Sequence, residues 1–141
     1  MKDTISKERG ATWSSCLKSN IARQAPPDKR LSDDLRELSD RRFAAYTALP
    51  EEHTETLVTL LYDVVRFVLE AITIERGFRV YNHECYGAFL KELGEEEAAK
   101  TFDQCRIIRN DINYYGKKIS KEDTEYAVRM LFDLKSKLKT I

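Results

Sequence analysis

The sequence lacks the short motifs that mark the common enzyme classes. It has no glycine-rich phosphate loop, no HExxH, no GxSxG and no cluster of metal ligands, and these classes are therefore disfavoured. Its cysteines, Cys16, Cys85 and Cys105, are odd in number and have no CxxC spacing. This pattern predicts reduced, structural thiols in an intracellular protein. We expect no metal and no cofactor.

Long apolar runs are also missing. The first ten residues, MKDTISKERG, contain none, and the most apolar part of the chain is interrupted by Asp63, Arg66 and Glu70. Neither a signal peptide nor a membrane span is expected, so the sequence predicts a soluble, cytoplasmic protein without a membrane partner. Lys plus Arg and Asp plus Glu both number 24. This balance argues against strong non-specific attraction to nucleic acid or acidic membranes.

The chain is long enough for one domain with its own core. Residues 1–30 are the least defined part, with a short helix around Trp13 to Ile21 that ends before the prolines. Ser32, followed by two aspartates, predicts a helix at 33–48. Pro50 then supplies the first turn of the most apolar helix, which runs to about Arg76 and stops at Gly77.

The second half of the chain has clear helix boundaries. Asn82 predicts the start of a short helix at 83–93, which Gly94 ends. A longer helix at 95–118 follows, and Ser120 with Asp123 predicts a capping box for the last helix. No segment alternates as a strand. The sequence therefore predicts an all-α antiparallel bundle of four main helices plus a short helix, formed by residues 31–141.

The stretch DQCRIIRNDINYYG, residues 103–116, carries the most informative pattern. At helical spacing, one stripe of its helix is expected to face the core: Ala98, Thr101, Cys105, Ile108, Ile112, Tyr115 and Ile119. The opposite side is polar: Arg106, Arg109, Asn110, Asn113, Tyr114 and Lys117. An ordinary solvated face is the alternative, but such faces are rich in Glu and Lys, which are absent here until Lys117. We expect this face to meet a ligand or a second subunit.

This stretch resembles the motif of HEPN domains, an all-α family whose signature is Arg, a polar residue, three variable residues and His. Arg109 and Asn110 match, whereas Tyr114 stands at the histidine position, giving RNxxxY. The YDVVR run at residues 62–66 and the RGFRVYNHE run at residues 76–84 also resemble the family. The resemblance covers about residue 31 to the end of the chain.

The resemblance implies a homodimer in which two motif helices form a composite site. Many members are metal-independent ribonuclease toxins, often paired with a nucleotidyltransferase-like antitoxin, and others bind RNA or a partner protein without catalysis. Carried over, it makes Arg109 and Asn110 catalytic residues, with Tyr114 or His83 as candidates for the missing base. The expected contacts to RNA, nucleotide or phosphate are Arg106, Arg109, Asn113 and Lys117.

The residue at the histidine position decides how much catalysis to expect. An unperturbed phenol has a pKa of about 10 and is a poor base near neutral pH. His83 is a candidate substitute, because packing the 83–93 and 95–118 helices antiparallel places it near Arg106 and Arg109. We favour the alternative, a structural histidine that serves the start of its helix and packs against neighbouring residues. We therefore expect an RNA- or nucleotide-binding dimer with weak or absent ribonuclease activity. The alternatives are an active endoribonuclease toxin and a structural or partner-binding helical dimer.

Overall fold

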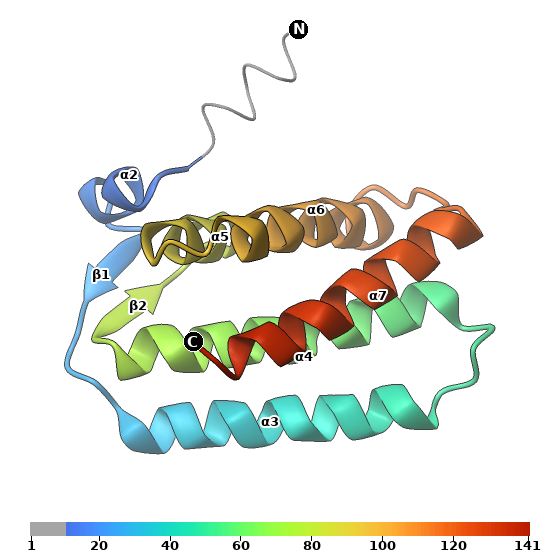
Figure 1. Cartoon of the computed structure of the whole chain (residues 1–141), viewed down its shortest axis with the longest axis horizontal. Coiled ribbons are helices and arrows are strands. Elements are labelled where there is room, and N and C mark those ends of the chain that lie inside the picture. The colour runs from blue at the N-terminus through green and yellow to red at the C-terminus, as the bar shows by residue number, and fades with distance from the viewer. Residues whose placement is uncertain (1–10) are drawn as a thin grey trace, which may run out of the picture.

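The computed structural model describes residues 11–141, which form a helical bundle (Figure 1). The main helices are α3 (Lys29–Ala48), α4 (Thr54–Glu75), α6 (Glu96–Asn113) and α7 (Lys121–Leu138), and the shorter ones are α2 (Trp13–Lys18) and α5 (His83–Glu92). Short connections join α3 to α4 and α5 to α6, as antiparallel neighbours require. The predicted all-α bundle of four main helices is confirmed.

Helix α4 is the centre of the core. It contacts α3, α5, α6 and α7. Most of its apolar side chains are almost completely buried, namely those of Val58, Leu61, Tyr62, Val64, Val65, Leu69, Ala71 and Ile72. Burying one such aliphatic side chain stabilises the fold by about 1.5–3 kcal/mol. The most apolar helix of the sequence is therefore the element on which the others pack.

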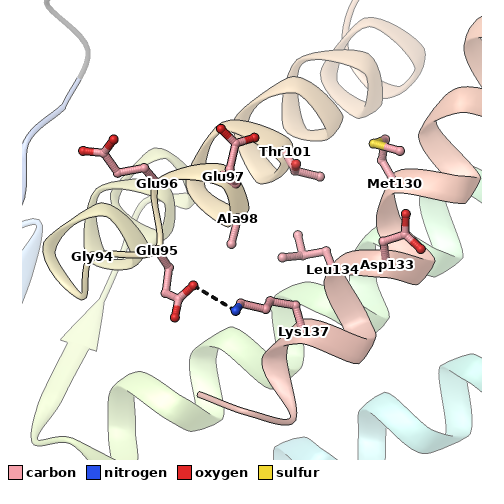
Figure 2. Close-up of a pocket in the computed structure, with 10 residues that line it drawn as sticks. All are labelled: Gly94, Glu95, Glu96, Glu97, Ala98, Thr101, Met130, Asp133, Leu134 and Lys137. Carbon is pink, nitrogen blue, oxygen red and sulfur yellow. Dashed lines mark ion pairs between the residues drawn. The ribbon is translucent and has the colours of Figure 1, made fainter.

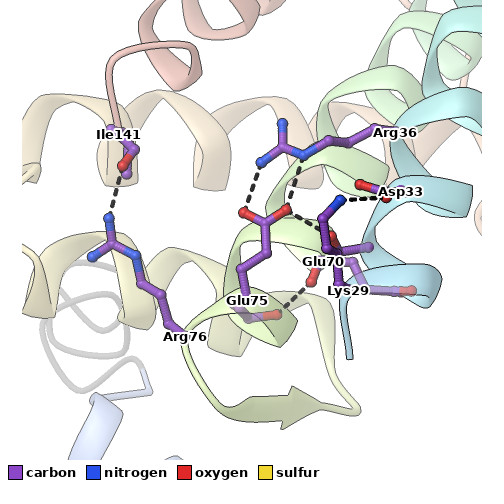
Figure 3. Close-up of polar contacts among 9 residues, drawn as sticks. Lys29, Asp33, Arg36, Glu70, Glu75, Arg76 and Ile141 are labelled. Atoms are coloured by element: carbon purple, nitrogen blue, oxygen red, sulfur yellow. Dashed lines mark hydrogen bonds and ion pairs between the residues drawn. The ribbon is translucent and has the colours of Figure 1, made fainter. Parts of the chain in front are cut away.

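Helix α3 begins earlier than the sequence predicted. Asp28 caps it by accepting a hydrogen bond from Leu31 N at 3.0 Å. Ser32, the predicted cap, is buried inside the helix and donates its hydroxyl to Glu75 at 2.7 Å. Arg36 donates two further hydrogen bonds to the same carboxylate, at 3.0 and 2.9 Å (Figure 3). The prediction of a start at residue 33 was wrong because Asp28 caps the helix, whereas the Ser32 side chain forms a hydrogen bond to Glu75 of α4.

Two short strands contradict the prediction that the chain has none. Strand β1 (Ala22–Gln24) pairs antiparallel with β2 (Phe78–Val80), with Ala22 opposite Val80. A strand of three residues is too short to show an alternating pattern of apolar and polar side chains. The pairing attaches the N-terminal part of the chain to the segment that leads into α5.

The cysteines also differ from the prediction, because Cys16 and Cys85 form a disulfide across 69 residues of sequence. Cys105 is free and buried. Near the disulfide, Ala11 N donates to Glu84 Oε1 at 3.1 Å. We call residues 11–25 the N-terminal brace, since the disulfide, this hydrogen bond and β1 all hold the first turn of α5 and the strand before it.

Several predicted helix ends are confirmed, but α3 begins earlier than predicted, α4 begins at Thr54 instead of at Pro50, and α6 ends early. Asn82 and Ser120 cap α5 and α7, and Gly77 and Gly94 take positive φ after α4 and α5. Helix α6 ends at Asn113 instead of 118. After the helix, Lys117 N donates a hydrogen bond to Asp111 O, and Gly116 takes a left-handed φ that turns the chain away from the helix axis.

The shortening of α6 moves predicted residues off the helix. Tyr115, predicted to face the core, is 68% exposed, and Tyr114 and Lys117 also lie beyond the helix. Among residues 11–141, no helix has the combination of length and apolar character that crossing a membrane would need.

Candidate functional site

Side chains from α4, α5 and α6 meet in one polar cluster beside the core. Tyr62 and Arg66 come from α4, His83 is the first residue of α5, and Arg106 and Arg109 lie in the second half of α6. The antiparallel turn at Gly94 brings the start of α5 back beside this part of α6. We call these five residues the arginine cluster.

Tyr62 forms the floor of the cluster. Its side chain is completely buried and its ring stacks on Phe102 with centroids 5.5 Å apart. The Arg109 guanidinium carbon lies 5.2 Å from the centre of the Tyr62 ring, and the Tyr62 hydroxyl lies 3.0 Å from His83 Nδ1. Tyr62 therefore links the arginine of α6 to the histidine of α5.

Arg109 lies near two aromatic rings and has no carboxylate partner among the described residues. Besides Tyr62, the ring centre of Tyr114 lies 5.1 Å from the guanidinium carbon. Arg109 Nη1 donates to the Tyr114 hydroxyl at 3.0 Å and to Asn110 Oδ1 at 3.3 Å. The positive charge of Arg109 is therefore held by π faces and neutral oxygens, an arrangement that leaves it available to an anion.

The other two guanidinium groups each have an acidic neighbour. Arg66 Nη1 pairs with Glu70 Oε1 at 3.2 Å, and the Tyr86 hydroxyl donates to the same oxygen at 3.3 Å. Arg106 Nε lies 3.5 Å from Asp103 Oδ1. The side chains of Arg66 and Arg106 are 18% and 19% exposed, so both reach solvent only partly.

Several buried polar atoms in this region have no hydrogen-bond partner. Among residues 11–141, the buried side-chain nitrogen and oxygen atoms without a hydrogen-bond partner are Nε of Arg66, Arg106 and Arg109 and Oδ1 of Asp103. The approach of Arg106 to Asp103 is thus an ion pair without hydrogen-bond geometry. Buried polar atoms are normally paired, and leaving one unpaired costs about 1–3 kcal/mol. Their concentration in one place marks this region for a role beyond packing.

The cluster shifts the titration of its own members. Burial, with the positive charges of Arg66, Arg109 and Arg106, lowers the pKa of His83 to about 4. Burial also raises the pKa of Tyr62 well above its ordinary value, against the opposing effect of the arginines. Both side chains are therefore neutral near pH 7.

The structure brings together some of the predicted site residues but not all. Arg106, Arg109 and His83 belong to the cluster, and Asn110 and Tyr114 contact Arg109. The remaining two contact other partners: Asn113 accepts from Thr59 Oγ1 at 3.3 Å, and Lys117 pairs with Asp111 at 3.5 Å.

The predicted orientation of α6 needs one correction. Arg106 and Arg109 were expected on a face opposite the core, but Arg109 lies over the Tyr62 ring of α4, and the charge of Arg106 is close enough to lower the pKa of His83 of α5. Phe102, which lay outside the predicted core stripe, is fully buried. The reason is that α4, α5 and α7 all contact α6, so a wider arc of this helix is covered than a single stripe allows.

Sequence reasoning did not assign Tyr62, Arg66 and Asp103 to the site. Arg66 and Glu70 interrupt the most apolar helix of the chain, and this was the available signal. A charged residue in a helix that is otherwise buried needs a partner or a ligand. The partner elements, α5 and α6, could be identified only in the folded chain.

A separate hollow of about 660 Å³ lies near the start of α6 and the end of α7 (Figure 2), and its lining on α6 ends at Thr101 and does not reach Arg109. Its wall combines acidic and apolar side chains, including Glu95, Glu97, Ala98, Met130 and Leu134. Lys137 pairs with Glu95 at 3.4 Å. None of the unpartnered buried atoms lies among its lining residues. Within residues 11–141, no group of three or more potential metal ligands is present.

Comparisons with known proteins leave the site to be interpreted from its own geometry. A scan against protein-family models found no match, and neither did searches of curated proteins and of solved structures.

Proposed function

We propose that the chain is a HEPN-like, dimeric RNA- or nucleotide-binding protein with weak or absent metal-independent ribonuclease activity. The observation that carries the proposal is the arginine cluster, in which three guanidinium groups with unpartnered Nε atoms surround a neutral tyrosine–histidine pair. Arginine presents a planar set of donors that matches phosphate oxygens. Arg109 is the primary phosphate ligand, since it has no carboxylate to compete with an incoming anion.

Exposed aromatic side chains beside Arg109 suit the bases of a single strand. Tyr114 and Tyr115 are 65% and 68% exposed and follow directly on α6. Stacking of a base on such a ring is worth about 1–3 kcal/mol and tolerates different bases. A phosphate on Arg109 with a base on Tyr114 or Tyr115 is therefore the binding mode we propose.

The proposal includes a homodimer formed through α6 and a cytoplasmic location. Ile107 supports the dimer, because it is 42% exposed between the two arginines of α6. A toxin role beside a nucleotidyltransferase-like antitoxin belongs to the same proposal and rests on the HEPN resemblance alone. Light scattering tests the dimer: Ile107→Glu is expected to give a monomer, and a parent chain that is monomeric at high micromolar concentration contradicts it.

Titration of labelled single-stranded RNA tests the binding site. We expect Arg109→Ala to weaken binding by about tenfold or more and to lower the slope of log K against log salt by about one. Arg41→Ala is the matched control, because Arg41 lies on α3 with its side chain 74% exposed. If Arg109→Ala binds as tightly as the control, the site lies elsewhere.

The second candidate is an active metal-independent endoribonuclease. One specific observation favours it, namely that His83 lies in the same cluster as Arg106 and Arg109. The low pKa of His83 makes it a weak base, which is why we rank this function second. Cleavage of RNA by the parent chain in EDTA, lost in His83→Ala, would reverse the ranking.

A further inference from the structure

In the buried hydrogen bond between Tyr62 and His83, the surrounding residues determine which side chain is the donor. The Tyr62 hydroxyl lies 3.0 Å from His83 Nδ1, and no other hydrogen-bond partner for this hydroxyl is present among residues 11–141. A buried hydroxyl has one proton to donate. The cationic neighbours Arg66, Arg106 and Arg109 are donors only, so they cannot accept it.

The Tyr62 proton therefore goes to Nδ1 of His83. Nδ1 can accept it only if it carries no proton of its own, which assigns the neutral tautomer with its proton on Nε2. The titration of both side chains agrees with this assignment. Burial holds the proton on the phenol by raising the pKa of Tyr62, and the pKa of His83, at about 4, keeps the imidazole neutral.

In this tautomer neither His83 nor the three arginines have a free nitrogen lone pair, and all four offer hydrogen-bond donors. His83 offers Nε2–H, and Arg66, Arg106 and Arg109 offer guanidinium N–H groups. A general base needs a free lone pair, and here the lone pair of His83 is already engaged by Tyr62. The arrangement suits the recognition of an oxyanion better than the removal of a proton.

The number of donors bears on which phosphate is recognised. A phosphate monoester has three non-bridging oxygens and a charge near −2 at neutral pH. A phosphodiester within a strand has two such oxygens and a single negative charge. Glu70 and Asp103 offset part of the positive charge of Arg66 and Arg106, whereas Arg109 has no such partner. A site with three guanidinium groups and an N–H therefore gains most from the monoester.

Building on the proposed function, we infer that the arginine cluster recognises a terminal phosphate monoester, with His83 as a hydrogen-bond donor through Nε2. The monoester can belong to the 5′ or 3′ end of a single-stranded RNA or to a free mononucleotide. In each case it offers the same dianionic group.

Competition binding with end-defined ligands tests this inference. The probes are one short single-stranded RNA with a 5′-phosphate, with a 3′-phosphate or with hydroxyls at both ends, and a nucleoside 5′-monophosphate with its nucleoside. We expect a terminal phosphate to strengthen binding by about tenfold, roughly the effect of one charged hydrogen bond. The two RNA ends and the mononucleotide separate the possible sources. Equal affinity of the phosphorylated and hydroxyl-ended strands overturns the inference.

Substitutions at His83 and Tyr62 separate a donor from a base. His83→Gln, which keeps an N–H near the position of Nε2, is expected to retain the preference for the phosphorylated end, whereas His83→Ala loses it. Tyr62→Phe removes the hydroxyl that fixes the His83 tautomer, and it is expected to reduce the preference for the phosphorylated end. Tyr46→Phe is the control, since this tyrosine of α3 packs against Phe43 and Phe132 and contacts no residue of the cluster. Loss of the preference in Tyr46→Phe equal to that in Tyr62→Phe contradicts the assigned role.

Nitrogen NMR of the parent chain provides a readout that does not depend on binding. Chemical shifts of ¹⁵N-labelled histidine distinguish the two neutral tautomers from the imidazolium. We expect the Nε2–H tautomer for His83 near neutral pH, and the Nδ1–H tautomer overturns the inference. RNA that binds through Arg109 without end preference refutes only this inference. Failure of every RNA and nucleotide to bind refutes the proposed function itself.

Discussion

Gly87 of α5 packs directly against the Asp103 carboxylate of α6. A Cβ atom added at Gly87 would lie 2.5 Å from Asp103 Oδ1, closer than real side chains approach. The absence of a side chain at Gly87 therefore leaves room for the Asp103 carboxylate, which lies 3.5 Å from Arg106 of the same helix. This contact connects the packing of α5 to the charge arrangement of the arginine cluster.

Gly87→Ala is expected to lower the free energy of unfolding by up to about 1 kcal/mol, because the new methyl group must displace the Asp103 carboxylate while the better helix propensity of alanine offsets part of that cost. Urea denaturation measures the effect. In an Asp103→Ala background the same substitution has room, and the better helix propensity of alanine is expected to make it neutral or stabilising by up to about 1 kcal/mol. Asp103→Asn is the size-matched control that keeps the clash. Equal costs in the Asn and Ala backgrounds would show that Asp103 is not the obstacle.

The disulfide between Cys16 and Cys85 is expected to stabilise the fold by about 4 kcal/mol, because it closes a loop of 69 residues in the unfolded chain. Thermal unfolding with and without a reducing agent measures this, with Cys16→Ala as the genetic equivalent. Alkylation of the denatured, unreduced protein followed by mass spectrometry should modify only Cys105. Modification of all three cysteines would mean that the protein is reduced, as the sequence had predicted.

Protonation of His83 should make the fold sensitive to acid. Its pKa in the folded chain is about 4, below the ordinary 6.5, so between these values the unfolded chain binds a proton that the folded chain does not. Stability is therefore expected to fall as the pH decreases from about 6.5 to about 4. Urea denaturation across this range should show a smaller loss in His83→Gln than in the parent.

The control for this titration is His53→Gln, since His53 is exposed at the start of α4 and makes no side-chain capping bond. It should retain the pH dependence of the parent. Parallel stability curves for the parent and His83→Gln would count against the buried, neutral state of His83.

A histidine at position 114 tests whether the site lacks only a base. Tyr114 occupies the position of the motif histidine and its hydroxyl accepts a hydrogen bond from Arg109. General base catalysis is worth about 10² to 10⁴ in rate, so Tyr114→His is expected to raise cleavage of RNA in EDTA within that range. Arg109→Ala in the same background should abolish the gain. A Tyr114→His variant that is folded and dimeric yet inert would favour a binding protein without catalysis.

The parts of the fold that depend on local chemistry could be predicted from the sequence. Asn82 and Ser120 cap helices through their own side chains, and Gly77 and Gly94 take the positive φ that ends a helix. The burial of α4 follows from its own apolar residues. In each case the sequence within one or two turns contains the whole physical cause.

The errors arose where a distant residue decides the outcome. Ser32 looks like a helix cap until Glu75 takes its hydroxyl, and Cys16 looks like a free thiol until Cys85 lies beside it. Arg66 was missed as a site residue for the same reason, since α4 meets α6 only in the folded chain. Arg109 and His83 were predicted because motif spacing and an antiparallel helix pair were enough to place them together.

The N-terminal brace provides an intrinsic optical reporter for the region that supports His83. Trp13 is the only tryptophan of the chain and is buried against Phe78 and Phe89, with ring centroids 5.1 and 5.3 Å away. Its emission therefore senses whether the brace is seated on β2 and α5, independently of the helix content seen by circular dichroism. A red shift on reduction of the disulfide, without loss of helical signal, would reveal local release of this region in the unlabelled protein.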